Sequence, residues 1–171
     1  MVKKLDKKGG VIILTYYWPP SGGSGVQRWM YFSKYLKELG WNPFVITVDQ
    51  KKASYPVLDK SLEKIVKDIE VIKTSTNEPL KLFSFLTTGD LRKGIPQGDI
   101  KNKGLFDKLF NYIRSNYFIP DARLGWVDYA YRECKKLIIK NKIKHVITTG
   151  PPHSTHLIGL KIKKDFEINW T

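Results

Sequence analysis

The sequence predicts an α/β domain in which a doubly wound parallel sheet carries helices on both faces. Short apolar runs such as residues 10–16 and 145–149 have the length and composition of strands that are buried on both sides. They alternate with longer segments whose apolar residues recur every three or four positions, as on one face of a helix. When strands and helices alternate in this way, right-handed crossovers place the helices on both faces of a parallel sheet.

The first strand and helix are joined by prolines and glycines. Residues 10–16 form the strand, and a helix is predicted over residues 26–39, with Gly40 as its C-terminal stop. Ser24 and Gln27 have the spacing of a capping box, which predicts that the helix starts directly after the glycine cluster. The predicted core stripe of this helix is Trp29, Phe32, Leu36 and Leu39.

Two more strands are predicted over residues 44–48 and 69–73, with an amphipathic stretch at residues 62–66 between them. Residues 87–103 are polar and rich in glycine and lysine, which predicts a mobile loop. Residues 106–117 then have apolar side chains along one helical face. The first half of the domain therefore has the order β-α-β-α-β.

The second half repeats the pattern after a break at Pro120. A long helix is predicted from about Trp126, followed by the strand at residues 145–149 and by a helix that contains Leu157 and Leu160. The predicted core face of the long helix is Trp126, Ala130, Cys134, Leu137 and Ile138. With a strand order of 3-2-1-4, strands one and four flank the point where ligands bind in such sheets.

Length and composition limit the class of protein. The 171 residues suit one domain, and the longest apolar runs fall far short of the ~18 residues of a membrane-spanning helix. We therefore expect a cytoplasmic protein, and we expect the single cysteine, Cys134, to fill core space. The net charge of +14 favours an acidic partner, namely nucleic acid, anionic lipid or a phosphorylated substrate. The alternative is a lysine-rich composition without a functional role.

A glycine cluster separates the first strand from the first helix, where free backbone N–H groups and the helix dipole favour an anion. The cluster matches neither the dinucleotide-binding fingerprint nor the P-loop. It predicts a phosphate site; the alternative is a tight turn that needs positive φ. Arg28, in the first helical turn, either adds charge to this site or is a solvated surface residue. The predicted anion-binding residues are Gly22, Gly23, Ser24, Gly25 and Arg28.

A second junction, residues 148–156, brings His153 and His156 near the predicted cleft. The pair lacks a third ligand nearby, which argues against a metal site, and His153 suits contact with a sugar hydroxyl or a phosphate. The alternative is a histidine that caps the helix or packs in the core. Asp121 and Arg123 lie between two predicted helices, where they suit an internal ion pair or a ligand clamp.

Three segments in order, TYYWPPSGGSGVQRW, FIPDAR and TTGPPHSTHLIGL, together resemble the N-terminal domain of family 4 glycosyltransferases of the GT-B architecture. The resemblance extends over essentially all 171 residues and is closest to a bacterial branch that builds surface polysaccharides. It implies a Rossmann-like domain on the acceptor side of a retaining enzyme. A second Rossmann-like domain would hold the nucleotide sugar, and transfer would occur between the two.

The resemblance also implies roles for the two junctions. Gly22 and Gly23 would approach the donor diphosphate through backbone N–H groups. Acceptor contacts would come from Asp121, Arg123, His153 and His156, with His153 the candidate catalytic residue. The family transfers a hexose without metal or other cofactor. We expect the nucleotide-sugar domain, with most catalytic groups, to follow Thr171, and residues 1–171 alone to be inactive.

The implied partners are a nucleotide diphosphate sugar and a glycan or lipid-linked acceptor, with peripheral contact between the basic surface and the inner face of an anionic membrane. The rival prediction is a nucleic-acid-binding or other anionic-partner-binding module, which the charge of +14 favours. Against it, the sequence has no helix-turn-helix, RNP or zinc signature. A third alternative is a stand-alone nucleotide-binding or scaffold domain.

Overall fold

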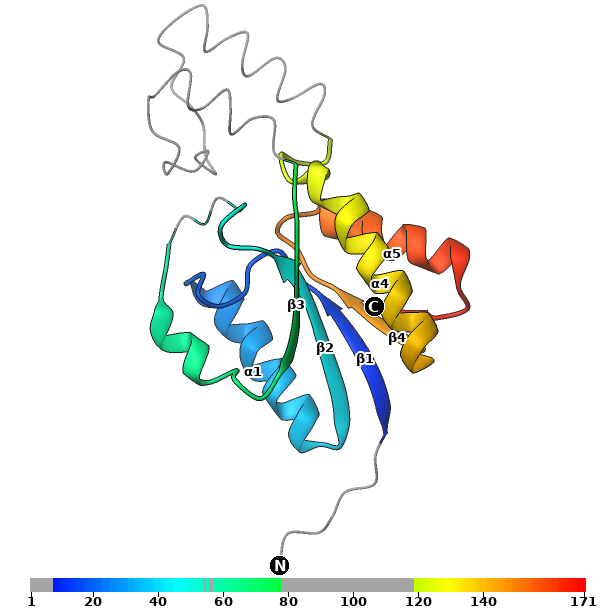
Figure 1. The fold of residues 1–171 in the computed structure, drawn as a ribbon, viewed down its shortest axis with the longest axis horizontal. Coiled ribbons are helices and arrows are strands. Elements are labelled where there is room, and N and C mark those ends of the chain that lie inside the picture. Colours follow the sequence, from blue (N-terminus) through cyan, green and yellow to red (C-terminus); the bar gives the residue numbers. More distant parts are fainter. Residues whose placement is uncertain (1–7, 54, 56, 78–118) are drawn as a thin grey trace, which may run out of the picture.

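A five-stranded parallel sheet forms the centre of the domain (Figure 1). The computed structural model describes residues 8–53, 55, 57–77 and 119–171. The strand order β3-β2-β1-β4-β5 confirms the predicted doubly wound α/β fold and the predicted order of the first four strands. The strands are β1 (Gly9–Leu14), β2 (Trp41–Val48), β3 (Glu70–Thr74), β4 (His145–Thr148) and β5 (Asn169–Trp170).

Helices cover both faces of this sheet (Figure 1). The helix α1 (Ser24–Glu38) and the short 3₁₀ helix η1 (Lys60–Lys64) lie on one face. The other face carries α4 (Val127–Asn141), which follows the 3₁₀ turn η2 (Leu124–Trp126), and α5 (Ser154–Asp165). The crossovers after β1 and β4 therefore lead to opposite faces of the sheet.

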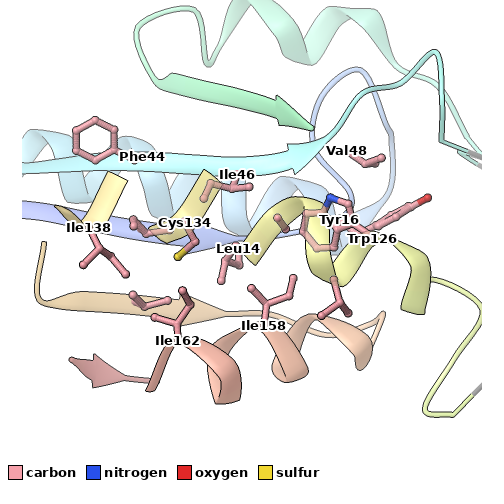
Figure 2. Packing of buried hydrophobic residues seen from close by; sticks show 14 of the residues in the cluster. Leu14, Tyr16, Phe44, Ile46, Val48, Trp126, Cys134, Ile138, Ile158 and Ile162 are labelled. Carbon is pink, nitrogen blue, oxygen red and sulfur yellow. The ribbon is translucent and has the colours of Figure 1, made fainter. Parts of the chain in front are cut away.

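Alternate residues of each central strand enter different cores. Ile13 and Val45 pack against Met30 and its neighbours on the α1 side. Ile12 and Leu14 point the other way, toward α4 and α5. Figure 2 shows the larger core, in which the labelled side chains from β1, β2, α4 and α5 meet. Burial on both faces explains why β1 is a continuous apolar run.

Trp126 anchors the start of α4 to the ends of two strands. Its side chain has no exposed surface, and its ring packs edge-on against that of Tyr16 with centroids 5.5 Å apart. Its indole N–H donates to Oγ1 of Thr74, at the end of β3, over 2.7 Å. The predicted core role of Trp126 is confirmed.

The predicted core stripe of the first helix is wrong in part. Val26, Met30 and Ser33 are the buried residues of α1. Phe32 and Leu39, both predicted to be core residues, are 41% and 52% exposed. The spacing of an apolar stripe identifies a helix, but the arc that meets the sheet depends on how the helix docks, and here that arc is centred near Met30.

Several boundaries differ from the predictions by a few residues. The amphipathic stretch at 62–66 forms the 3₁₀ helix η1 with Leu62 buried, and the segment at 168–171 adds β5 beside β4. The predicted loop at 87–103 and the predicted helix at 106–117 lie outside the described residues. Within the portion that is described, no helix is long and apolar enough to cross a bilayer.

Cys134 is buried in the core between α4 and the sheet, as predicted. Burial raises the pKa of its thiol from its ordinary value of 9.0 to about 12, because the thiolate would lose its hydration. In the unfolded chain the thiol ionises first, so the stability that it contributes is complete below pH 9.0 and is lost as the pH rises toward 12.

We therefore expect Cys134 to resist alkylation by iodoacetamide in the folded protein near neutral pH. The folded state holds about a thousand times less thiolate than the unfolded chain, and the side chain has no exposed surface. Mass spectrometry of protein labelled with and without urea measures the difference. Equal labelling rates under both conditions would contradict the buried position.

Candidate functional site

A cavity of about 620 Å³ opens at the carboxyl ends of β1 and β4. The two strands are neighbours, and the helices that follow them lie on opposite faces of the sheet, so the cavity occupies the switch point of the strand order. Its lining residues come mainly from the two strand-to-helix junctions: Thr15, Tyr17, Ser21, Gly22, Gly23, Ser24, Gly25, Val26, Arg28, Trp29, Val57, Thr149, Gly150 and Pro151.

Residues 57–59 hold the glycine loop in place. The N–H of Gly22 donates to the carbonyl of Val57 over 2.9 Å, and the N–H of Asp59 donates to the carbonyl of Pro20 over 2.7 Å. Gly23 then turns the chain into α1 with φ 107° and ψ 162°. This backbone conformation is essentially restricted to glycine, so the turn requires glycine at this position.

The N-terminus of α1 is uncapped, and the predicted capping box is wrong. The helix begins at Ser24, one residue earlier than the capping box requires, and its N-cap residue is Gly23, which has no side chain to cap with. The N–H groups of Val26 and Gln27 both turn back to the carbonyl of Gly23. The described hydrogen bonds include none from the N–H groups of Ser24 and Gly25, so these donors face the cavity with the positive end of the helix dipole.

Side chains around these N–H groups add to the preference for an anion. Arg28 is exposed and lines the cavity, and the first turn of α1 has no acidic residue. Within the described residues, the Ser21 hydroxyl and the Trp29 indole N–H are buried without a hydrogen-bond partner, and both residues line the cavity. A bound oxygen-rich ligand would satisfy these polar groups.

The N-terminus of α5 differs, because a carboxylate already caps it. Oδ2 of Asp121 accepts from the N–H of Ser154 over 2.8 Å, and Oδ1 accepts from the N–H of Arg123 over 2.9 Å. Asp121 thereby ties the loop before α4 to the start of α5. A carboxylate therefore already occupies the N-terminus of α5, whereas the described hydrogen bonds leave that of α1 open to a ligand anion.

Arg123 lies in the interior, behind the cavity. Its side chain is 7% exposed, and its guanidinium carbon lies 5.1 Å from the ring centroid of Tyr16, in a cation–π contact. Neither Arg123 nor Asp121 is among the residues that line the described cavity. The two residues, predicted to form an internal ion pair or a ligand clamp, thus make contacts that join the end of β1 to α4 and α5.

His153 and His156 lie side by side, with ring centroids 6.0 Å apart, next to Gly150. A Cβ atom added to Gly150 would lie 3.1 Å from Nδ1 of His153 and 3.1 Å from Nε2 of His156. Gly150 lines the cavity, whereas neither histidine belongs to the described lining. The two rings therefore adjoin the cavity at one point of its wall.

Hydrogen bonds from β4 and β5 orient His156. The indole N–H of Trp170 donates to Oγ1 of Thr148 over 2.9 Å, and that oxygen lies 2.9 Å from Nδ1 of His156. The Thr148 oxygen could also accept from Nδ1 through its second lone pair, but among the described hydrogen bonds its own hydrogen has no acceptor other than Nδ1, which favours donation to that atom. With that direction, the neutral imidazole of His156 carries its hydrogen on Nε2, the atom next to Gly150.

We expect nitrogen-15 NMR of the imidazole to find neutral His156 in the Nε2–H tautomer. A Thr148→Val variant should lose this preference, because its side chain cannot donate to Nδ1. His145, which contacts the ring of Trp41, serves as the internal control and should not change. An Nδ1–H tautomer of His156 in the unaltered protein would contradict the assigned hydrogen bonds.

Part of this site escaped sequence reasoning. Thr15 and Tyr17 follow β1, and Thr149 follows β4, so their positions just past strands that flank the switch point were available as a signal. Val57 had no such signal, because it reaches the cavity through a hydrogen bond to Gly22, thirty-five residues away in the chain. In the described ranges, no three His, Cys, Asp or Glu side chains gather where they could hold a metal ion.

Fold and site together define a class: a parallel α/β domain with a cavity at its switch point, into which the uncapped N-terminus of α1 opens. Comparisons with protein-family models, with curated proteins and with solved structures gave no match. The assignment of a function therefore depends on the geometry of the site and on the sequence resemblance.

Proposed function

We propose that this domain is the acceptor-side half of a retaining family 4 glycosyltransferase, which transfers a hexose from a nucleotide diphosphate sugar to a glycan or a lipid-linked acceptor. One observation carries the proposal. The open N-terminus of α1, with Gly23 as its N-cap and Arg28 beside it, faces a cavity at the carboxyl edge of a parallel sheet. That arrangement suits the diphosphate of a sugar nucleotide.

In the proposed reaction, negative charge develops on the diphosphate beside the N-terminus of α1. The bond between the anomeric carbon and the diphosphate oxygen breaks, and a bond from the acceptor hydroxyl oxygen to that carbon forms. The diphosphate oxygen takes the electron pair of the broken bond, and the proton of the acceptor hydroxyl passes to that oxygen. Backbone N–H groups of Ser24 and Gly25, with the guanidinium of Arg28, would stabilise the charge that develops on the leaving group.

The proposed division of the cavity follows its two walls. The β1–α1 wall would hold the diphosphate, and the β4–α5 wall around Gly150 would adjoin the acceptor, with His153 as the candidate catalytic residue. The volume of about 620 Å³ supports this proposal, because it falls within the range of small-molecule sites. A second domain would supply the contacts to the nucleoside and the remaining catalytic groups.

Thermal melting with pyrophosphate and with a panel of nucleoside diphosphate sugars tests the proposal. Both residues 1–171 and the protein that includes any sequence after Thr171 are measured, because ligands stabilise the state that binds them. We expect stabilisation that survives EDTA and that Arg28→Ala weakens. Arg132→Ala is the matched control, because Arg132 is also exposed but lies on α4, on the other face of the sheet.

Two results would overturn the proposed function. One is the absence of any response to sugar nucleotides in both forms of the protein. The other is tight binding of an oligonucleotide with a sequence preference that persists as salt is raised, which would favour the nucleic-acid module. A salt-sensitive affinity without sequence preference would reflect only the net charge of +14.

A further inference from the structure

The outward face of α1 carries large apolar side chains that the core does not use. We define the outer α1 face as Arg28, Tyr31, Phe32, Tyr35 and Leu39. The exposed fractions are 41% for Tyr31, 41% for Phe32, 56% for Tyr35 and 52% for Leu39. These residues lie opposite the buried side of the helix, so they form one stripe directed away from the sheet.

Contacts between the rings make this stripe continuous. The rings of Tyr31 and Tyr35 stack with centroids 6.4 Å apart, and Phe32 meets the half-buried Trp29 edge-on at 5.3 Å. A surface helix ordinarily presents charged and polar side chains to water, so four large apolar residues on that side need a separate explanation. In the part of the domain that the structure describes, packing does not supply it, since other residues of α1 fill the core.

Basic residues border the aromatic stripe. Within α1, Arg28, Lys34 and Lys37 outnumber the single acidic residue, Glu38. Lys37 donates to the backbone carbonyl of Asp68, which fixes α1 against the start of β3. The helix therefore combines exposed aromatic rings with an excess of positive charge, the combination that favours the interface of an anionic membrane.

We propose that the outer α1 face docks onto the surface of an anionic membrane. Tyrosine and phenylalanine rings would enter the headgroup region, while Arg28 and Lys34 meet lipid phosphates. The charge argues for this occupant over a second copy of the chain. Two copies, each with a net charge of +14, repel one another, whereas an anionic bilayer attracts each of them.

The other helical face of the sheet lacks exposed aromatic residues of this kind in the described structure, since its exposed large apolar side chains are Ile139 on α4 and Leu160 on α5. The exposed face of α4 has one large apolar side chain in the described structure, Ile139 at 62% exposure, and its other outward residues are mainly basic. Because α1 and α4 lie on opposite faces of the sheet, a flat membrane can contact only one of them (Figure 1). The exposed aromatic side chains of the outer α1 face therefore indicate that α1, and not α4, contacts the membrane.

This docking goes beyond the proposed transfer reaction and does not require it. The cavity opens at the N-terminus of α1, and Arg28 belongs both to its lining and to the outer α1 face. A membrane on this face would therefore lie close to the cavity mouth. Such a position suits an acceptor that is anchored in lipid.

Vesicle co-sedimentation tests the proposal with the unaltered protein and two variants of the outer α1 face, Tyr35→Ser and Phe32→Ser/Tyr35→Ser. The vesicles contain phosphatidylcholine, with or without phosphatidylglycerol. We expect binding only with phosphatidylglycerol, a decrease with added salt, and about a tenfold weaker partition for the double variant. Ile139→Ser is the matched control for Tyr35→Ser, because it removes an apolar side chain from α4 that is 62% exposed, against 56% for Tyr35, and should bind normally.

Circular dichroism first establishes that each variant is folded, which the exposure of the altered side chains leads us to expect. Unchanged binding by the double variant, or equal loss in Ile139→Ser, would overturn the assignment of the surface. The proposal would also be overturned if the protein did not bind vesicles. If it then formed a dimer that the double variant dissociates, the outer α1 face would serve self-association. Gly23→Ala changes the N-cap of α1 but no residue of the outer α1 face, so it should retain vesicle binding. The vesicle experiment can therefore succeed even if the proposed transferase function is wrong.

Discussion

Replacement of Gly23 by alanine is expected to weaken the binding of pyrophosphate and of nucleoside diphosphate sugars by about tenfold or more. Gly23 has φ 107° and ψ 162°, a conformation that costs an L-residue about 1–3 kcal/mol. A Cβ atom there would meet nothing within 4 Å, so the effect is backbone strain without a steric clash. Relief of that strain would turn the first N–H groups of α1 away from the cavity.

Gly9→Ala is the matched control for this variant. Gly9 has φ 108° and nothing within 4 Å of its added Cβ, so alanine there is also strained by a positive φ without a steric clash. It lies at the opposite end of β1 from the cavity. Isothermal titration calorimetry should find normal ligand binding for Gly9→Ala and weak binding for Gly23→Ala. If the two variants bind alike, the glycine loop is not the anion site.

Replacement of Trp126 by alanine is expected to cost about 3–5 kcal/mol of unfolding free energy. The side chain has no exposed surface, and its removal leaves a cavity beside Tyr16. It also removes the donor to Oγ1 of Thr74, which joins α4 to the end of β3. Loss of both the ring and the hydrogen bond should loosen the carboxyl edge of the sheet, where the ligand cavity lies.

Urea denaturation followed by circular dichroism measures this effect as a shift in the transition midpoint. Trp126→Phe retains most of the apolar volume and loses only the N–H donor. It should cost about 1–2 kcal/mol, because Thr74 still donates to the carbonyl of Thr47. Leu160→Ala, at a position 42% exposed, should change stability little. A cost below about 1 kcal/mol for Trp126→Ala would refute its role as the anchor of α4.

Local patterns were sufficient to predict the fold. The apolar run that became β1 is buried on both faces, and the run at 145–149 became β4, in which buried and partly buried residues alternate. The predicted order 3-2-1-4 is confirmed because parallel strands with alternating helices admit few connections. The strand order also predicted that the glycine cluster lies at the cavity. The cluster directly follows β1 in the sequence, and β1 ends at the switch point of the sheet.

Contacts between distant segments decided what the patterns did not. The capping box predicted at Ser24 and Gln27 is wrong, and the cap at the other junction comes from Asp121, which reaches Ser154 across thirty-three positions. Likewise Val57 closes the cavity through its bond to Gly22. Such pairings are invisible in a window of neighbouring residues, because they arise only when the folded chain brings remote segments within hydrogen-bond distance.

The sequence by itself thus determined the class of fold, the order of the central strands and the edge at which a ligand would bind. Those properties follow from hydrophobic periodicity and turn chemistry, which act over a few residues. The tertiary structure alone decided that α1 is open to an anion while α5 is already capped, and that Phe32 and Leu39 face outward. The rotation of a helix and the satisfaction of its first N–H groups depend on what packs against it, and that is settled only when the whole domain assembles.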